Sequence, residues 1–237
     1  MQIFTINDPH NRENPLIDIL GDSLIYHGTS SVFSQRIEEQ GFSFGGFKAT
    51  CGVEIGSIVA ACEKLYFKPD GFAAASGFSQ KNCVYFSVHF RSARAYALNT
   101  AGERMDGAIR AANAFVAFAN DRDHIARLAA HWEAVLNQHG PHAPTERVLS
   151  NLRNSELVRR LAEEVEISRS VLRKAFTKGK PVVYAVSADE AWIRELSTNA
   201  IGDWNKEPFG GIKLTDVPAN RIVARIDYPN GISPESE

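Results

Sequence analysis

The chain has 237 residues, of which 44% are hydrophobic and 23% are charged, and its formal net charge at pH 7 is −2. This length allows one large domain or two small ones, and the composition is that of an ordinary soluble globular protein. The small net charge does not indicate nucleic acid as a partner, although a local basic patch would not show in the total. No apolar run reaches the roughly 20 residues that a membrane-spanning helix needs.

The start of the chain, residues 1–8, lacks the basic stretch and apolar core of a signal peptide. We therefore expect a cytoplasmic protein, or one delivered to a host cytoplasm by a route without a cleaved signal. Cys51, Cys62 and Cys83 are odd in number and form no CxxC pair, so a disulfide framework or a zinc site is not indicated. We predict reduced, packed thiols.

The first 41 residues predict an irregular arm, a strand and a helix. Residues 1–20 are polar and contain several Asn and Asp, which is typical of an arm without regular structure. Residues 24–29 place β-forming residues before a histidine, a glycine and a hydroxyl, a pattern of a strand that ends at a pocket or in a polar turn. Residues 31–40 predict a helix, which Gly41 ends.

The next segment is rich in glycine. We interpret residues 42–82 as loop, including 71–79, apart from a helix around 55–65. A strand is predicted over 83–88 from its alternation of side chains. A helix begins at about 92 and continues with interruptions to 118.

From about residue 121 to 178 the sequence is helical in pattern. The large apolar residues of its first helix recur at spacings of three and four. They are Ile125, Leu128, Trp132, Val135 and Leu136. Two further helices are expected around 146–153 and 156–176.

The last part of the chain predicts three more strands. They are residues 182–186, 212–214 and 222–226, with a short helix near 189–196, a turn-rich stretch at 199–211 and a disordered tail from Pro229. These strands are too few for two independent sheets. We therefore predict a single α+β domain, residues 1–237, that carries a helical insertion at 121–178.

Most common catalytic and metal-binding patterns are missing. There is no P-loop, no Rossmann glycine fingerprint and no G-x-S-x-G elbow around a serine. A metal cluster of His124, His131, His139 and His142 is conceivable. We interpret these residues instead as solvated helix and loop histidines, because no carboxylate at ligand spacing accompanies the helical pair.

Two stretches share a format in which a strand runs into polar residues. The first is Tyr26–Thr29 (Tyr-His-Gly-Thr), and the second is Val84–Ser87 (Val-Tyr-Phe-Ser), followed by a helix with Ala93–Ala97 (Ala-Arg-Ala-Tyr-Ala). In this order they resemble the diphtheria-toxin-like, or His-Tyr-Glu, branch of the ADP-ribosyltransferase superfamily. That branch includes the poly(ADP-ribose) polymerases and the rifamycin-inactivating ADP-ribosyltransferases. The resemblance covers about 22–100 well and 180–228 loosely, and it does not cover the helical segment.

The resemblance implies a split β-sandwich whose cleft binds NAD. His27 would hydrogen-bond the adenosine ribose, the backbone of Gly28 would pair with the nicotinamide amide, and Tyr85 would stack on the nicotinamide ring. Three further NAD-binding residues are implied: Thr29, Ser87 and Tyr96. Thr29 and Ser87 would hydrogen-bond sugar or amide groups, and Tyr96 would pack on the same ring or support Tyr85.

The third motif departs from the family. Members place a Glu at the start of a strand that a Pro-containing turn follows, and aligned on residues 211–222 this position is Gly211. The nearest acid upstream is Glu207, which a loop could carry into the cleft, but it is equally well explained as an exposed loop acid. Asp203 and Asp216 are weaker candidates.

The resemblance implies an NAD-dependent mono-ADP-ribosyltransferase of toxin or effector type, with His27, Tyr85 and Glu207 as catalytic residues. NAD would be the donor substrate, and the acceptor a protein, a nucleic acid or a small molecule. Because of Gly211, the alternative is a degenerate member of the fold that binds NAD or a partner without transfer. A third hypothesis is a helix-mediated interaction module. Segment 121–178 would contact the target or an antitoxin, or would act as a brace.

Overall fold

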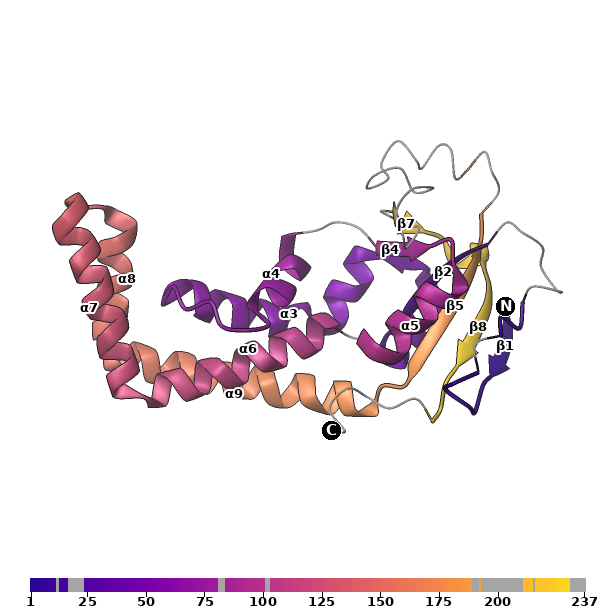
Figure 1. Cartoon of the computed structure of the whole chain (residues 1–237), viewed down its shortest axis with the longest axis horizontal. Helices are drawn as coiled ribbons and strands as arrows, with labels where there is room; N and C mark the ends of the chain where they lie inside the picture. The colour runs from indigo at the N-terminus through magenta and orange to yellow at the C-terminus, as the bar shows by residue number, and fades with distance from the viewer. Residues whose placement is uncertain are drawn as a thin grey trace. The chain divides into compact units, whose positions relative to one another are not determined.

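The computed structural model describes residues 1–11, 13–16, 24–80, 84–100, 103–188, 192, 211–214 and 216–230. These residues form helices and a mixed sheet, so the fold is α+β (Figure 1). The chain divides into two compact units, one of residues 1–50, 81–102 and 175–237 and one of residues 51–80 and 103–174. The first unit carries the described strands, and the second is helical.

The main sheet of the first unit has six strands in the order β1-β8-β5-β2-β4-β6. Their bounds are Gln2–Thr5 (β1), Ile222–Asp227 (β8), Pro181–Ser187 (β5), Leu24–Ser30 (β2), Val84–Ser87 (β4) and Gly211–Leu214 (β6). The pair β1–β8 is parallel, and the other neighbours are antiparallel. The strands predicted around 24–29, 83–88, 182–186, 212–214 and 222–226 are confirmed within a residue or two of these bounds.

The prediction of an irregular arm is wrong at residues 2–5. Those residues form β1 and pair with Ala224–Asp227 of β8. The strand is short, and three of its four residues are exposed, so its pattern carries no signal of a buried face. Pairing with β8, which is distant in the sequence, is what holds these residues in a strand.

A smaller sheet pairs β3 (Phe42–Ser43) with β7 (Asp216–Val217). Before β3 the chain forms a 3-10 turn at Ser31–Phe33 and the helix α2 at Ser34–Gln40, as predicted for 31–40. Gly41 ends α2 with a φ of 81°, a conformation that favours glycine. A second 3-10 turn, Ala219–Arg221, leads into β8.

One face of the main sheet is covered by α5 (Phe90–Thr100). Phe90, Ala93 and Ala97 of this helix pack in one core with sheet residues. The sheet residues are Leu24, Tyr26, Val183, Ala185, Ala224 and Ile226. Small side chains on the helix therefore let it lie close to β2 and β5.

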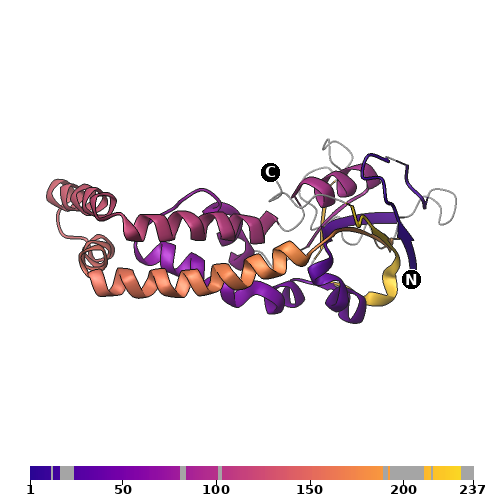
Figure 2. The same cartoon turned by 90° about the horizontal axis from the view of Figure 1, so that it is seen from below.

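The remaining helices are α3 (Phe44–Lys64), α4 (Phe72–Gln80), α6 (Glu103–Asn120), α7 (Arg122–His139), α8 (Ala143–Arg153) and α9 (Ser155–Lys178). In both views α6 and α9 run side by side (Figure 1, Figure 2), and Arg169 donates to the Asn113 side chain at 2.7 Å. The helices predicted around 108–118, 146–153 and 156–176 are confirmed. The helical unit contains residues 121–174 of the predicted insertion together with 51–80 and 103–120.

The loop prediction for 42–82 is wrong over most of its length, because α3 begins at Phe44 and α4 replaces the loop predicted at 71–79. One of these glycines, Gly71, is required by packing, because a Cβ there would overlap the carbonyl oxygen of Gly107 in α6. The short helix predicted near 189–196 and the turn-rich stretch 199–211 lie outside the described residues, apart from Trp192 and Gly211.

Cys51 and Cys62 are buried, as the prediction of packed thiols expects. Burial raises the pKa of the Cys51 and Cys62 thiols to about 12, with a smaller effect of the neighbouring Glu54 and Glu63 carboxylates. Cys83 lies outside the described residues. In the part of the chain that the structure describes, no helix has the length and apolar character that crossing a membrane requires.

Candidate functional site

The two strands that carry the predicted site residues are β2 and β4. All of their residues are described, and the ladder between them consists of one pair, Tyr26 with Ser87. On its other edge β2 pairs with β5 along its full length, from Leu24 with Ser187 to Ser30 with Pro181. The ladder between β2 and β4 thus stops beside His27 and Gly28.

The His27 side chain connects the two strands where the ladder stops. Its Nδ1 lies 2.7 Å from the Tyr85 carbonyl oxygen. A carbonyl oxygen can only accept, so Nδ1 donates and carries the hydrogen. In the neutral ring the acceptor lone pair is then on Nε2. The imidazole is thus held in one tautomer by the backbone of β4.

Aromatic rings surround the His27 imidazole. The Phe42 ring lies at a centroid distance of 5.0 Å and an interplanar angle of 68°, and the Phe86 ring lies at 5.4 Å and 50°. Phe42 and Phe86 contact each other at 5.0 Å. His27 is half-buried as a result.

Gly28 lies against α5. A Cβ at this position would overlap the carbonyl oxygen of Ala93 and would lie 2.9 Å from the backbone nitrogen of Ala97. Both obstacles are helix backbone and cannot rotate away as a flexible side chain can. The absence of a side chain at Gly28 is therefore required by the packing of α5, a reason that the sequence pattern did not supply.

Strand alternation divides the predicted residues between the two faces of the sheet. Tyr26 contacts Phe90 of α5 with ring centroids 5.6 Å apart, so the side chain of its partner Ser87 and that of Tyr85 also lie on the α5 face. Tyr96 belongs to α5 itself and is 40% exposed. His27 and Thr29 point to the opposite face. The structure thus brings Tyr85 and Ser87 to the face of α5, and the Tyr85 carbonyl joins His27 to this group.

The two predicted hydroxyls are buried. Thr29 is paired with Val182 of β5, and Ser87 accepts a hydrogen bond from the His89 backbone nitrogen at 3.0 Å. The Ser87 bond fixes the turn that connects β4 to α5. Both residues therefore contribute to the structure that supports the site. Their hydroxyls also remain candidates for contact with a ligand.

The third motif falls partly within the described residues. Gly211 begins β6 and pairs with Ser87, so it lies in the same row of the sheet as Tyr26. Asp216 is exposed and pairs with Ser43 in the smaller sheet. Glu207 and Asp203 lie outside the described residues.

A polar network beside His27 is not apparent from the sequence. Tyr184 and Arg225 occupy the same row of the sheet as His27. The Tyr184 hydroxyl donates to Glu38 at 3.0 Å, and Arg225 bridges the carboxylates of Glu38 and Asp227. These residues come from α2, β5 and β8, which no sequence spacing links.

The charges of this network are mutually satisfied. Burial raises the pKa of the Tyr184 phenol. The hydrogen bonds that Arg225 donates to Asp227 and Glu38 raise the pKa of its guanidinium. Arg225 is thus a cation that stays charged, and it ties α2 to the sheet on the face that His27 occupies.

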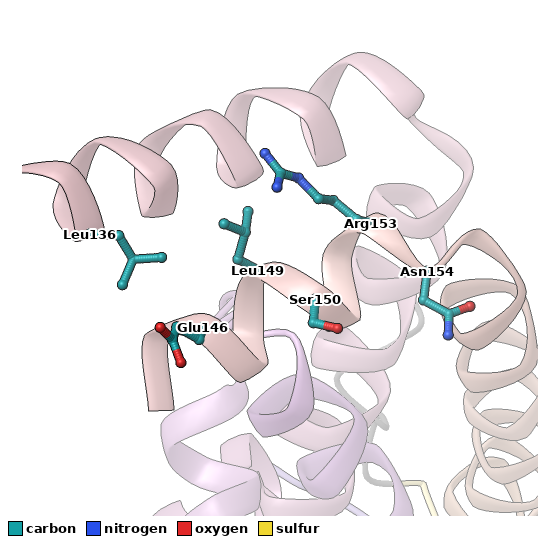
Figure 3. A pocket seen from close by; sticks show the side chains of 6 residues that line it. All are labelled: Leu136, Glu146, Leu149, Ser150, Arg153 and Asn154. Carbon is teal, nitrogen blue, oxygen red and sulfur yellow. The ribbon is translucent and has the colours of Figure 1, made fainter. Parts of the chain in front are cut away.

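The helical unit contains a separate cavity of about 380 Å³ between α7 and α8 (Figure 3). Its lining residues are Leu136, Glu146, Leu149, Ser150, Arg153 and Asn154. Arg153 is paired with Glu133 at 2.9 Å, and both side chains are more than half exposed. None of the predicted site residues that the structure describes lines this cavity. Among the residues that the structure describes, no His, Cys, Asp and Glu side chains gather in a group that could hold a metal ion.

Comparison of the chain with known protein families, with curated proteins and with solved structures finds no match. The geometry itself offers an imidazole in a fixed tautomer, an aromatic ring on the neighbouring strand, and a β2 edge whose ladder stops between them. These features suit the binding and orientation of a flat, polar ligand. The imidazole donates to a carbonyl and not to a nucleophile, which fits an anchoring role.

Proposed function

We propose that this protein is an NAD-dependent mono-ADP-ribosyltransferase. The observation that carries the proposal is the end of the β2–β4 ladder at Tyr26 and Ser87, with the His27–Tyr85 hydrogen bond beyond it. Nicotinamide is a flat ring with an amide, so it can pair with strand backbone at Gly28 and stack on an aromatic ring at the same time. Tyr85, on the next strand, is the aromatic ring in question.

The arrangement of strands supports the fold that the resemblance implies. The six-stranded sheet and the two-stranded sheet β3–β7 would correspond to the two layers of a split β-sandwich. The strand with His27 lies between β5 and the strand with Tyr85, which in turn lies beside the third-motif strand β6. All three motifs thus meet on neighbouring strands.

In the proposed complex His27 accepts a hydrogen bond from an adenosine ribose hydroxyl through Nε2. Tyr85 stacks on the nicotinamide ring, and Tyr96, exposed on α5, packs on the same ring or supports Tyr85. Because His27 and Thr29 lie on one face of the sheet and Tyr85 and Ser87 on the other, the proposed NAD passes the end of the β2–β4 ladder to contact both pairs. Each of these contacts orients NAD without taking part in bond making.

The proposed reaction breaks the bond between the ribose C1′ and the nicotinamide nitrogen. Nicotinamide leaves with the electron pair, an oxocarbenium-like centre develops at C1′, and a nucleophile of the acceptor attacks it and loses a proton. Such a reaction depends on positioning and on a carboxylate that favours the developing positive charge. Glu207, four positions before Gly211, is the carboxylate that we propose for this role.

The alternative function is NAD or partner binding without transfer. The observation that favours it is Gly211, which holds the family's glutamate position at the start of β6 and has no carboxylate. In that case the frame around His27 and Tyr85 would bind NAD and leave it intact.

We further propose that the acceptor is a protein, a nucleic acid or a small molecule in a cytoplasm, and that segment 121–178 contacts the target or an antitoxin. The feature that supports a contact role is α7. It carries the apolar stripe from Ile125 to Leu136, yet none of its residues is buried. A half-exposed apolar stripe is suited to a protein surface.

The test is transfer of label from adenylate-labelled NAD to a cell lysate, with separate measurement of nicotinamide release. We expect the wild-type protein to label an acceptor, and His27→Ala, Tyr85→Ala and Glu207→Ala each to reduce the labelling at least about tenfold, as the loss of a transition-state contact does. Matched controls are His10→Ala and Glu63→Ala, which remove an exposed histidine and an exposed glutamate outside segment 121–178.

The possible outcomes separate the alternatives. If Glu207→Ala keeps full activity, the catalytic acid lies elsewhere. If the wild-type protein binds NAD but releases no nicotinamide with any acceptor class, the degenerate fold is correct. Absence of NAD binding would overturn both.

A further inference from the structure

Phe42 has a special place among the rings around His27. It is 1% exposed, and it contacts His27 at 5.0 Å, Phe86 at 5.0 Å and Tyr184 at 5.5 Å, each ring approaching edge to face. Phe86 and Tyr184 belong to the main sheet, whereas Phe42 belongs to the smaller sheet. It is the contact through which β3 reaches the His27 imidazole.

The position of Phe42 is itself fixed by residues 217–219, which follow the Gly211 position of the third motif. Phe42 pairs with Val217 in the β3–β7 ladder. Gly41, immediately before it, has a φ of 81°, and a Cβ there would overlap the Val217 carbonyl oxygen and lie 2.7 Å from the Ala219 nitrogen. The chain therefore enters β3 through a glycine that fits closely against residues 217–219.

The Phe42 ring restricts the rotation of the imidazole. A half-turn about the Cβ–Cγ bond of His27 would move Nδ1 away from the Tyr85 carbonyl and put a carbon in its place. The sp³–sp² torsion of a histidine is broad and two-fold in the absence of neighbours, so the hydrogen bond alone leaves the alternative orientation accessible. Rings at 5.0 and 5.4 Å oppose the turn by close packing.

We propose that Phe42 is a positioning residue that holds the His27 imidazole with Nδ1 on the Tyr85 carbonyl and Nε2 toward the ligand. The proposal rests on the proposed binding of NAD through His27. It adds that segment 216–221 takes part in NAD binding at a distance, since β7 holds Phe42 in place. Phe42 does not touch NAD.

The test is a double-mutant cycle for NAD binding measured by isothermal titration calorimetry. His27→Ala is expected to weaken NAD binding about tenfold, the value of one good hydrogen bond to a ligand. Phe42→Leu keeps an apolar side chain but removes the ring edge, and we expect it to weaken NAD binding about fivefold. In the His27→Ala background, Phe42→Leu should have no further effect, because the side chain through which it acts is gone.

Phe90→Leu is the matched control. Phe90 is 6% exposed and contacts a ring of the same strand, Tyr26, but on the opposite face of the sheet. The Phe90→Leu variant loses about as much buried aromatic surface as Phe42→Leu does, so the unfolding temperatures of the two variants should fall by similar amounts. Its affinity for NAD should stay within about twofold of the wild type.

A second measurement follows the His27 ring without ligand. The ¹⁵N chemical shifts of the imidazole distinguish a hydrogen on Nδ1 from one on Nε2. We expect the wild type and Phe90→Leu to show the Nδ1–H form, and Phe42→Leu to show a mixture of the two tautomers. Gly41→Ala should behave like Phe42→Leu if it folds.

The outcomes keep this proposal apart from the proposed function. If NAD binds and the effects of His27→Ala and Phe42→Leu are additive, Phe42 has only a packing role and the positioning proposal is wrong. If the wild type does not bind NAD, the proposed function fails, and the tautomer measurement still decides whether Phe42 orients His27. An unchanged Nδ1–H form in Phe42→Leu would overturn the positioning proposal in either case.

Discussion

The two edges of strand β2 differ in how they are held. Toward β5 all seven residues are paired, and the neighbouring side chains are buried. Toward β4 the ladder has one pair, and beyond it the His27 side chain donates to the Tyr85 carbonyl. The first edge is an ordinary antiparallel ladder, in which side chains contribute packing.

On the second edge a titratable side chain makes the hydrogen bond between the strands. On the first edge backbone groups make these hydrogen bonds. A side chain can exchange its hydrogen-bond partner for a ligand. In a continuous ladder the backbone groups are already paired with each other, so none is left for a ligand. The difference explains why a binding site is expected on one edge only. The following changes are designed to remove or enlarge that difference.

The largest effect is expected from Gly28→Ala. The added Cβ meets helix backbone on the face of α5, so the helix and the strand must separate. We expect the free energy of unfolding to fall by about 3 kcal/mol, at the upper end for overpacked cores. Equilibrium urea denaturation followed by circular dichroism measures it.

Gly56→Ala in α3 is the control, because nothing lies within 4 Å of an added Cβ there. It should raise stability by up to about 1 kcal/mol, as alanine does in place of glycine in a helix. Equal stabilities of Gly28→Ala and the wild type would contradict the close approach of α5 to β2.

His27→Ala is expected to have the next largest effect. It removes the hydrogen bond to the Tyr85 carbonyl and two ring contacts, and we expect a loss of about 2 kcal/mol. Hydrogen exchange should show faster exchange of the β4 amides and little change in β5. His142→Ala, at an exposed histidine, should stay within about 0.5 kcal/mol of the wild type. Equal loss of protection in β4 and β5 would argue against a special role of His27 at one edge.

The smallest effect is expected on the pH dependence of stability, through Tyr228, which follows β8 on the fully paired side of β2. Burial raises the pKa of Tyr228, next to β8, to about 12, whereas in the unfolded chain it is near the ordinary value of 10. The phenol is protonated in both states below pH 10, so its contribution is constant there. Above pH 10 the unfolded chain loses the proton first, and stability falls as the pH rises toward 12.

At pH 11 this single group should lower the free energy of unfolding by about 1.4 kcal/mol relative to pH 9. Tyr228→Phe should remove that part of the alkaline loss, which denaturation curves at pH 9 and pH 11 would measure. Tyr66→Phe, at an exposed tyrosine, controls for the removal of a phenolic hydroxyl as such. An unaltered loss in Tyr228→Phe would show that its phenol titrates alike in both states.

The sequence predicted the elements whose signal is local. The helix at 31–40 and its end at Gly41, the strands at β2, β4, β5, β6 and β8, and the helices from 122 to 178 all follow from the spacing of apolar residues or from turn residues. The sequence pattern also singles out His27, Gly28 and Tyr85 as candidate site residues.

The errors have a common cause. Gly71 contributes to the wrong loop prediction for 71–79, whereas in the structure it lies against Gly107 of α6, a residue 36 positions away in the chain. Strand β1 has no buried face of its own and is ordered by pairing with β8, at the other end of the chain. Local patterns cannot show either partner.

The sequence alone indicates the strands and helices that have a local signal and the residue types at the end of β2, because periodicity and turn chemistry act within a few residues. Three features come from contacts that the fold creates: α5 requires a glycine at position 28, His27 donates to the Tyr85 carbonyl with Phe42 against its ring, and Gly211 lies beside Ser87. Each of these contacts joins segments far apart in the chain. They form because packing and hydrogen bonding between distant segments, and not local preference, select one arrangement.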